Sequence, residues 1–474
     1  MTLFRIFNTK DNLCKRKFLR ITFALSLFFF FGLLASVISS TSPGFFTSSA
    51  LAATGEFSSA PTLVEADYPT YFGLSSRVIV WILAQLHLFF AAFVLAVPIF
   101  VVILEALGMF TKDKRYDKTA FEFLKVCLTA YSVTAFIGGL LAISLMVLYP
   151  DLMDYLFSIF GSTILFYAFI FFAETATLYI YYYGWRRMVG GKKKWLHLGV
   201  GLLLNSFGTG LMFVANAWVT FMMSPEGVDL AGTFDGNVWH AINNHLWNPI
   251  NLHRFIANLA YGGSIVGAYA AYKFLGSSTD EERGHYDWMG YTANFIAICA
   301  LLPLPFAGYW LTAEIYAFSQ QMGITLMGGF FAWIFIVQAV LIGALFLAAN
   351  YYLWCAMERS KGSERFTPYI KYIGFVLVLA FLVWFTPHTL IQKPWEMGAN
   401  QGGYHPLLSP LGLMPAKNIA VNIMILATFL SFLLYRRVNI LPTVKWAKKG
   451  TSVQVALFTA GVLNIVILGI YYGY

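Results

Sequence analysis

Charged residues are scarce in this sequence. Only 11% of its 474 residues are charged, 59% are hydrophobic, and the mean hydropathy is +0.68. Soluble domains of ordinary composition are far less apolar than this. The scarcity of charge therefore excludes a soluble protein and predicts a polytopic membrane protein.

Cysteine is scarce as well. The four cysteines lie far apart, and none belongs to a CxxC or CxxCH pattern. This excludes a covalently attached c-type haem and a zinc finger, and it provides no disulfide framework. The net charge of +9 does not indicate nucleic-acid binding, because the basic residues stand in short segments between apolar stretches, as the positive-inside rule requires.

The sequence begins with a basic segment followed by an apolar one. Residues 1–52 resemble a secretory signal peptide, with Ala50-Leu51-Ala52 as an A-x-A cleavage site. An uncleaved signal anchor is the alternative. In either case, the residues from about Ala53 onward begin on the outer side of the membrane.

Ten apolar segments are long enough to cross a bilayer as helices, which takes about 20 residues. The expected spans are residues 77–100, 123–148, 156–183, 196–222, 253–273, 289–311, 324–354, 372–391, 419–435 and 453–472. Basic loops alternate with acidic or polar ones, so the first span runs from outside to inside. The expected fold is an all-α transmembrane bundle in residues 53–440, with an additional C-terminal helix in residues 441–474.

A few polar side chains lie within these spans, and each needs a partner because the bilayer core holds no water. His87 lies in the first span and His253 opens the fifth. Each imidazole is either a metal ligand or a hydrogen-bonded structural residue. Glu174, in the third span, is either part of a proton relay or a helix–helix hydrogen-bonding group.

Small and soft residues accompany these polar groups. Gly262, Gly263 and Gly267 let another helix or a flat ring approach the fifth span, and helix packing is the more frequent reason for such glycines. Met322 and Met327 are either core filler or the methionine of a His–Met pair on haem iron.

The remaining histidines toward the outer side are His240, His245 and His405, in loops, and His388, at the end of the eighth span. Solvated side chains are expected for the three in loops. Together with the buried groups, the pattern favours haem or metal redox chemistry in a membrane, with a transporter as the alternative.

Five local patterns resemble subunit I of the cytochrome bd quinol oxidase family. In chain order they are Ser76-Arg77 ahead of His87, Phe171-Phe172-Ala173-Glu174 with Gly184-Trp185, Val214-Ala215-Asn216-Ala217-Trp218 with Pro225, His253 at the start of its span, and Gln392-Lys393-Pro394-Trp395. The resemblance extends from Arg77 to about Tyr435 and covers nine spans in matching order.

This resemblance implies a bundle that holds three haems near the outer face. It implies that His87 is the axial ligand of a high-spin haem and that His253 binds a low-spin haem b. Met327 is implied as the second ligand of that low-spin haem, with Met322 as the alternative. His388 stands near the position of a glutamate ligand in the family, so it is expected to bind the other high-spin haem. Haem b is therefore the expected cofactor, and haem d is a further candidate.

The resemblance also implies roles beyond iron ligation. Glu174 is expected in the proton route, Arg77 in the catalytic site and Trp395 in cofactor binding. Two glutamates of the family are missing here: Phe166 stands two turns before Glu174, and residues 142–144 carry no carboxylate.

The implied activity is that of a bd-like terminal oxidase subunit in the bacterial inner membrane. Its expected partners are dioxygen, a second membrane subunit and an electron donor. The outer segment after the sixth span, where the family binds quinol, shrinks to residues 313–323. The donor is therefore either quinol or a periplasmic electron carrier. The alternatives are a haem-b electron-transfer subunit without oxygen chemistry, and a haem-free transporter or assembly component.

Overall fold

The computed structural model describes residues 70–71, 73–229, 232–319, 322, 332–359, 366–385, 405, 407–408 and 413–438. The expected signal segment, residues 1–52, lies outside them, and so does the additional C-terminal helix expected in residues 441–474. Three residues of the predicted site, Met327, His388 and Trp395, also lie outside the described residues.

The described chain is helical apart from one small hairpin, which confirms the predicted fold class. Strands β1 (Thr70–Tyr71) and β2 (Leu74–Ser75) pair antiparallel just before the first helix. The helices are α2 (Ser76–Thr111), α3 (Lys114–Leu148), α4 (Pro150–Gly184), α5 (Gly191–Met223), α6 (Val238–Ile242), α7 (Trp247–Gly276), α8 (Asp280–Leu301), α9 (Leu304–Phe318), α11 (Ala332–Arg359), α12 (Thr367–Phe385) and α13 (Leu413–Val438). With the short α6 set aside and α8 and α9 taken together, they follow the order of the first nine predicted spans.

Within the described residues, six helices are long and apolar enough to cross a membrane, or seven if the bent pair α8 and α9 forms one span. The chain bends by 41° between these two helices. Pro303 stands at the bend, where its missing N–H and fixed φ interrupt the helix. The single span predicted over residues 289–311 therefore corresponds to two helices, which extend from Asp280 to the break and from the break to Phe318.

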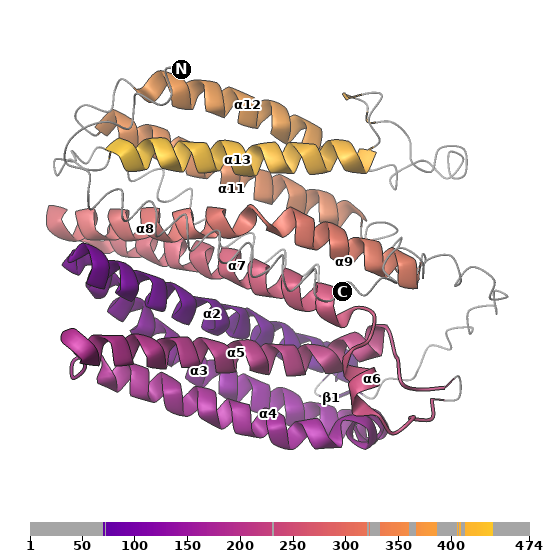
Figure 1. Ribbon diagram of the computed structural model, residues 1–474. Coiled ribbons are helices and arrows are strands. Elements are labelled where there is room, and N and C mark those ends of the chain that lie inside the picture. Colours follow the sequence, from indigo (N-terminus) through magenta and orange to yellow (C-terminus); the bar gives the residue numbers. More distant parts are fainter. Residues whose placement is uncertain are drawn as a thin grey trace.

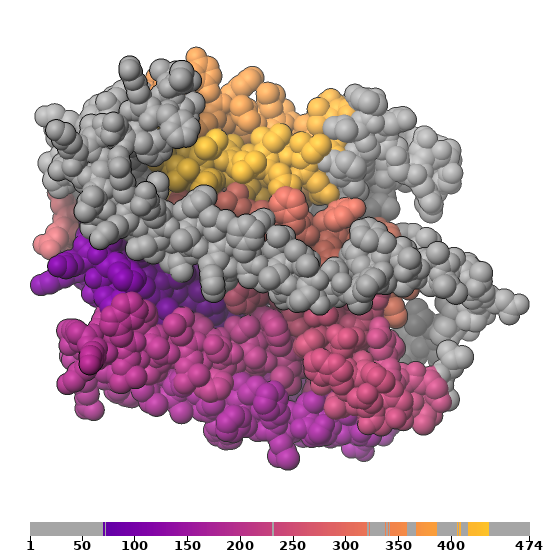
Figure 2. All heavy atoms as spheres, in the orientation of Figure 1, coloured from indigo at the N-terminus to yellow at the C-terminus, as the bar shows by residue number. Residues whose placement is uncertain are grey.

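The helices lie side by side with roughly parallel axes (Figure 1). α2 packs against α3, α5 and α7 and so occupies the middle of the first half of the bundle. α6 lies near β1 at one end of the bundle (Figure 1), which we call the outer end. We call the opposite end, where residues 112–118 and 186–194 lie, the basic end. In the space-filling view, the indigo-to-magenta helices occupy the lower part of the visible face, and the yellow α13 lies in its upper part (Figure 2).

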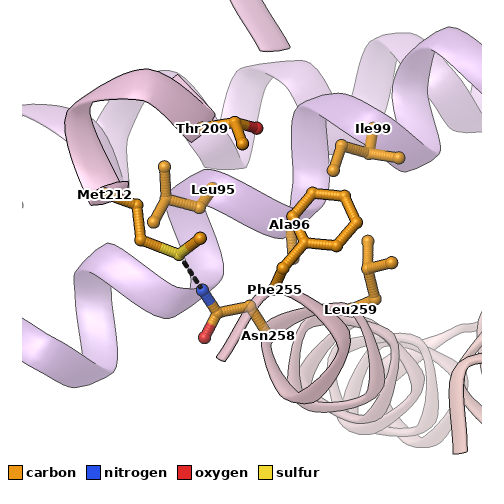
Figure 3. Close-up of a pocket in the computed structure, with 8 residues that line it drawn as sticks. All are labelled: Leu95, Ala96, Ile99, Thr209, Met212, Phe255, Asn258 and Leu259. Carbon is orange, nitrogen blue, oxygen red and sulfur yellow. Dashed lines mark hydrogen bonds between the residues drawn. The ribbon is translucent and has the colours of Figure 1, made fainter. Parts of the chain in front are cut away.

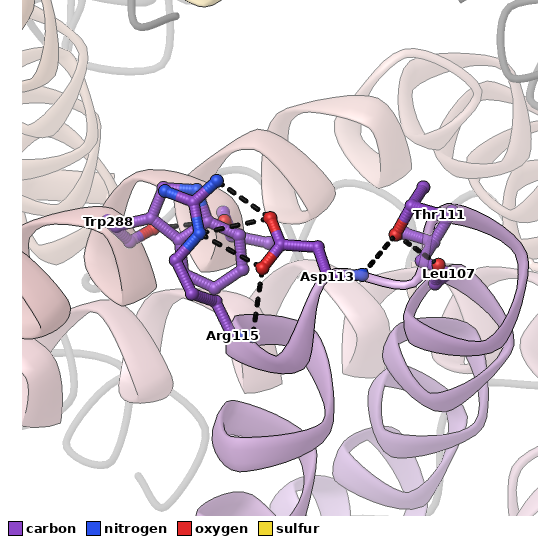
Figure 4. A network of polar contacts seen from close by, with 6 residues as sticks. Leu107, Thr111, Asp113, Arg115 and Trp288 are labelled. Carbon is purple, nitrogen blue, oxygen red and sulfur yellow. Dashed lines mark hydrogen bonds and ion pairs between the residues drawn. The ribbon is translucent and has the colours of Figure 1, made fainter. Parts of the chain in front are cut away.

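At the basic end, α2 and α3 are joined by a two-residue connection (Figure 4). α2 ends because Lys112 adopts a left-handed conformation with φ 60°. Asp113 then caps α3 by accepting a hydrogen bond from the Arg115 backbone N–H at 3.0 Å. The Arg115 guanidinium binds the same carboxylate at 2.7 Å and lies over the Trp288 ring. These bonds hold the pKa of the Asp113 carboxyl below its usual value.

Glycines let α7 approach its neighbours closely. A Cβ atom at Gly262 would lie 2.5 Å from the Cβ atom of Ala96 on α2, and one at Gly263 would lie 2.9 Å from the Ala293 carbonyl oxygen on α8. At Gly267 the nearest atom is the Asn294 side chain, at 2.8 Å. Helix packing is therefore the role of these glycines, as expected. The close approach brings the polar residues of α2 and α7 into one half of the bundle.

Candidate functional site

His87 lies on α2 with its ring turned toward α3. Its Nδ1 atom is 3.1 Å from the backbone carbonyl oxygen of Thr134. A carbonyl can only accept a hydrogen bond, so Nδ1 carries the proton and donates it. Nε2 is then left with a free lone pair, which is the form in which histidine binds a metal.

Gly138, one turn beyond Thr134, provides the space for this ring. A Cβ atom at position 138 would lie 2.7 Å from His87 Cε1 and 2.9 Å from Nδ1. At Gly139, the next residue, a Cβ atom would meet nothing within 4 Å. The orientation of His87 therefore depends on the absence of a side chain at position 138.

His253 lies in the second turn of α7, because that helix begins at Trp247 rather than at His253 as the sequence indicated. The ring lies against α9, where a Cβ atom on Gly308 would be 3.7 Å from its Nε2 atom. The side chain is partly buried. Neither of its ring nitrogens has a hydrogen-bond partner within the part of the chain that the structure describes.

Arg254 follows His253 and carries a positive charge into α7, which was predicted to span the membrane but is not among the helices apolar enough to do so. Its Nη1 atom donates to the side-chain oxygen of Asn216, and the amide nitrogen of Asn216 donates to Asn251 at 2.7 Å. Sequence reasoning missed Arg254, although Asn216 belongs to one of the quoted motifs. The signal was available, since a cation inside an apolar span needs a partner.

Glu174 is buried in α4, with 4% of its surface exposed. Its side-chain oxygen would lie 2.7 Å from a Cβ atom on Gly208 of α5. Among the described residues, no hydrogen bond or ion pair reaches its carboxyl group. The expected alternative of a helix–helix hydrogen bond thus has no support from the described chain.

A small cavity lies where α2, α5 and α7 meet (Figure 3). Its volume is about 10 Å³, close to the space needed for one water molecule. Asn258 and Thr209 contribute polar groups to the lining, and the Asn258 amide donates to the Met212 sulfur at 3.5 Å. Leu95, on the same lining, also flanks Gly208 and Glu174.

The outer end holds a second set of polar residues. His245 Nε2 lies 2.8 Å from a carboxylate oxygen of Glu314 on α9, and Trp310 donates its indole N–H to the other oxygen at 3.0 Å. Sequence reasoning did not single out Glu314. His245 was expected to be solvated; it is exposed, as expected, and it is also paired with Glu314. His405 was expected to be solvated too, which is wrong: it is fully buried and hydrogen-bonded to the Val383 carbonyl.

Beside His245, an open cavity of about 480 Å³ lies between the loop after α5 and α6. Its wall includes Glu226, Asp235 and His240. His240 is 58% exposed, as expected, and its Nδ1 atom lies 2.7 Å from a carboxylate oxygen of Asp235. Partial burial raises the pKa of the Glu226 carboxyl, whereas the hydrogen bond from His240 lowers the pKa of Asp235. The outer surface thus carries acidic groups close to the His245–Glu314 pair.

The basic end contains a buried carboxylate that sequence reasoning also missed. Glu105 of α2 is fully buried and accepts hydrogen bonds from the Tyr181 hydroxyl at 2.5 Å and from His197 Nδ1 at 2.6 Å. Lys194 forms an ion pair with it at 2.9 Å. Lys194 lies in the first turn of α5, and its side chain is only 14% exposed.

Two further predicted site residues lie within the described chain. Arg77 is exposed in the first turn of α2. Met322 is partly buried and packs against Leu246, Ile250 and Ile315, close to the start of α7. The structure thus places Met322 in the same outer region as His253, while Arg77 is at the helix end.

Comparison with known proteins identifies the family to which this chain belongs. The family model for cytochrome bd terminal oxidase subunit I matches residues 75–332. Among solved structures, the bd oxidase from Geobacillus thermodenitrificans is similar at 15% identity, covering 84% of this chain and 95% of that chain with a TM-score of 0.46. No curated protein matches. Because the family match spans more than half of the chain, the protein belongs to the cytochrome bd terminal oxidase subunit I family.

Proposed function

We propose that this protein is a haem-bearing terminal oxidase subunit that passes electrons from a donor at the outer side to a site where dioxygen is reduced. Membership of the family makes it a multi-pass membrane oxidoreductase of the inner membrane, with haem as its general class of cofactor. The observation that carries the proposal is the state of His87. Its Nδ1 proton is donated to Thr134, so that Nε2 is oriented and free to bind iron.

The residues present fit haem. His87 and His253 each offer an imidazole nitrogen without a partner in the described chain, and each ring faces a glycine on the neighbouring helix. A haem bound through such residues would carry electrons and, at an open iron position, reduce dioxygen. We assign His87 to the high-spin site and His253 to low-spin haem b. Met327 is the proposed second ligand of the low-spin haem, with Met322 as the alternative.

The other site residues keep the roles inferred from the family. His388 is proposed as a ligand of the other high-spin haem, of type b or d, and Trp395 as a cofactor contact. Arg77 is proposed to act at the outer edge of the catalytic site, since it is exposed there. A second membrane subunit is expected to cover part of the bundle.

Protons must reach the reduction site because dioxygen reduction consumes them. We assign their delivery to Glu174, which is buried without a hydrogen-bond partner among the described residues. An unpaired carboxyl in a dry environment is suited to taking up and releasing a proton. The one-water cavity is lined by Leu95, which also lies beside Gly208, and a water bound there would continue the route toward α7.

The His245–Glu314 pair supports quinol as the donor. Oxidation of a quinol releases two protons with its two electrons, so a quinol site needs a proton acceptor. The pair lies at the outer end, and Glu314 is on the same helix as Gly308, which touches His253. This arrangement would accept a proton close to the ligand of the low-spin haem.

The central test is spectroscopic. Purified protein is expected to show b-type haem bands that change on reduction, with haem types identified by pyridine haemochrome analysis. Substituting His253 by Ala should abolish the low-spin signal, while the exposed His240→Ala control should leave it intact. A colourless preparation from haem-replete cells would refute the assignment and favour a transporter or assembly role.

The donor has a separate test. Glu314→Gln should slow turnover with quinol while leaving turnover with an artificial one-electron donor such as tetramethylphenylenediamine unchanged. An equal loss with both donors would contradict a role in quinol oxidation and point to a general structural effect. An unchanged rate with quinol would leave a periplasmic carrier as the proposed donor.

A second function has one observation in its favour. Phe166 replaces a glutamate that the family uses, and it is 55% exposed. Phenylalanine has no ionisable group, so it cannot carry a proton at this position. A haem-b electron-transfer subunit without oxygen chemistry has no need of that carboxylate. Membranes that take up oxygen, and lose this activity in the His87→Ala variant, would exclude the second function.

A further inference from the structure

Arg254 is a cation without a charged partner in the described chain. It lies in the second turn of α7, and no carboxylate of the described residues lies within ion-pair distance of it. Its side chain bonds only the amide oxygen of Asn216. A guanidinium carries five N–H donors, so most of its hydrogen-bonding capacity is unused. Charged groups taken out of water are costly and are normally paired.

A second donor at the same place is also unused. Asn251, one turn before Arg254 on α7, accepts a bond from Asn216 with its oxygen. Its amide nitrogen is buried and has no partner in the described chain. Buried donors without partners are rare in proteins and call for an explanation. Arg254 and Asn251 thus both have side-chain N–H groups that lack an acceptor in the described chain.

The position of these donors indicates what they bind. Arg254 is adjacent to His253 in the sequence, and its charge is close enough to act on both His253 and His87. An anion that pairs with Arg254 would therefore lie close to His253. The charged groups of a haem are its two propionate carboxylates, and arginine binds a carboxylate through two parallel hydrogen bonds.

We propose that Arg254, with Asn251 beside it, binds a propionate carboxylate of the haem that His253 holds. This inference rests on the proposed function and adds a cofactor-binding residue to it. The positive charge of Arg254 favours the reduced haem, which carries one positive charge fewer than the oxidised form. Arg254 therefore raises the reduction potential of this haem and positions its plane relative to α7.

A purely structural role for Arg254 is the competing explanation. In that case the guanidinium only ties α7 to α5 through Asn216, and its removal would alter stability but not redox properties. The two explanations differ in one measurable quantity, the midpoint potential of the low-spin haem. They also differ in the expected effect of Arg254→Lys, because lysine keeps the positive charge but cannot form two parallel hydrogen bonds with one carboxylate.

The experiment compares Arg254→Gln, Arg254→Lys and Asn251→Ala with wild type. Haem content and the midpoint potential of the low-spin band are measured by redox titration of purified protein. Arg115→Gln is the control, because Arg115 is a paired cation at the basic end. Arg254→Gln should make reduction about tenfold less favourable, a shift of about 59 mV to lower potential for one electron. Arg254→Lys should retain most of the potential, and the control should be unchanged.

The outcomes separate the two levels of inference. Wild-type protein without haem overturns the proposed function itself. Haem-replete wild type combined with an unshifted potential in Arg254→Gln overturns only the assignment of Arg254. If Arg254→Gln does not fold, Asn251→Ala decides the matter: a lowered haem content or potential supports propionate binding, and wild-type values for both refute it.

Discussion

Substituting Gly138 by Ala tests the position of His87 with a single methyl group. The added Cβ atom would lie 2.7 Å from His87 Cε1, whereas ordinary contacts are 3.4–4 Å. The ring must therefore retreat by at least about 0.7 Å, or α3 must move away from α2 by as much. Overpacking of this kind typically costs about 1–3 kcal/mol of stability.

The displacement matters more for metal binding than for folding. Ligand distances in metal sites hold to about 0.2 Å, so a shift of roughly three times this tolerance disrupts axial ligation. It also stretches the bond from Nδ1 to the Thr134 carbonyl, which is already 3.1 Å long and fixes the orientation of the ring. We therefore expect Gly138→Ala to fold but to lose or shift the high-spin haem signal.

The chain offers a matched control for this variant. Gly139→Ala adds the same methyl group one residue later, where nothing lies within 4 Å. Both variants gain similar helix propensity, so a difference between them reports on the contact with His87. The assay is the reduced-minus-oxidised spectrum together with oxygen uptake. Identical high-spin spectra and oxygen uptake in the two variants would refute the role assigned to His87.

Three other predictions follow from individual contacts. Gly208→Ala places a methyl group 2.7 Å from the Glu174 carboxyl, so oxygen uptake should fall at least tenfold, while Gly210→Ala, where the nearest atom is at 3.8 Å, should keep it. Glu105→Gln leaves the buried His197 without its carboxylate and Lys194 with Asp117 alone, and it should cost about 3 kcal/mol, seen as a lower midpoint of thermal unfolding in detergent. Asp280→Asn, in an exposed pair, should have no such effect. The pKa of Glu226 is raised, so its ionised form destabilises the fold at neutral pH. Glu226→Gln should therefore increase the free energy of unfolding by less than about 1 kcal/mol at pH 7 and leave it unchanged at a pH well below 4.5. Thermal unfolding at both pH values measures this difference.

The sequence was sufficient for the features that depend on one segment at a time. Span order follows from runs of apolar residues, and the close approach of α7 to its neighbours follows from Gly262 and Gly263. His87 and His253 stand out because a buried imidazole needs a partner wherever the rest of the chain lies. Each of these inferences uses local composition and the properties of the bilayer.

Features that depend on contacts between distant segments were missed. Glu105 and His197 are 92 residues apart, and nothing in either local sequence indicates that they meet. The same holds for His245 and Glu314, which join a loop to α9. His405 was taken as solvated because its loop is polar, whereas its ring is bonded to the last residues of α12.

The distribution of paired and unpaired ionisable groups supports placing cofactor chemistry toward the outer half of the bundle. At the basic end, Glu105 has three partners and Glu122 is held by Tyr269, Tyr286 and His285 at 3.0–3.4 Å. These groups are complete, so they need nothing further to explain their burial.

In the outer half, by contrast, the His253 ring and the Asn251 amide nitrogen have no hydrogen-bond partner in the described chain, and Arg254 bonds only the Asn216 side-chain oxygen. Leaving the His253 ring and the Asn251 amide unpaired, and Arg254 without a counter-charge, destabilises the fold unless something binds there. Under the proposed function, a bound haem would supply both kinds of partner at once, iron for the imidazole and carboxylates for the cation and the amide. Haem-depleted protein should therefore lose hydrogen-exchange protection in α7 around residues 251–254 while α2 near Glu105 stays protected, and equal loss at both places would contradict this division.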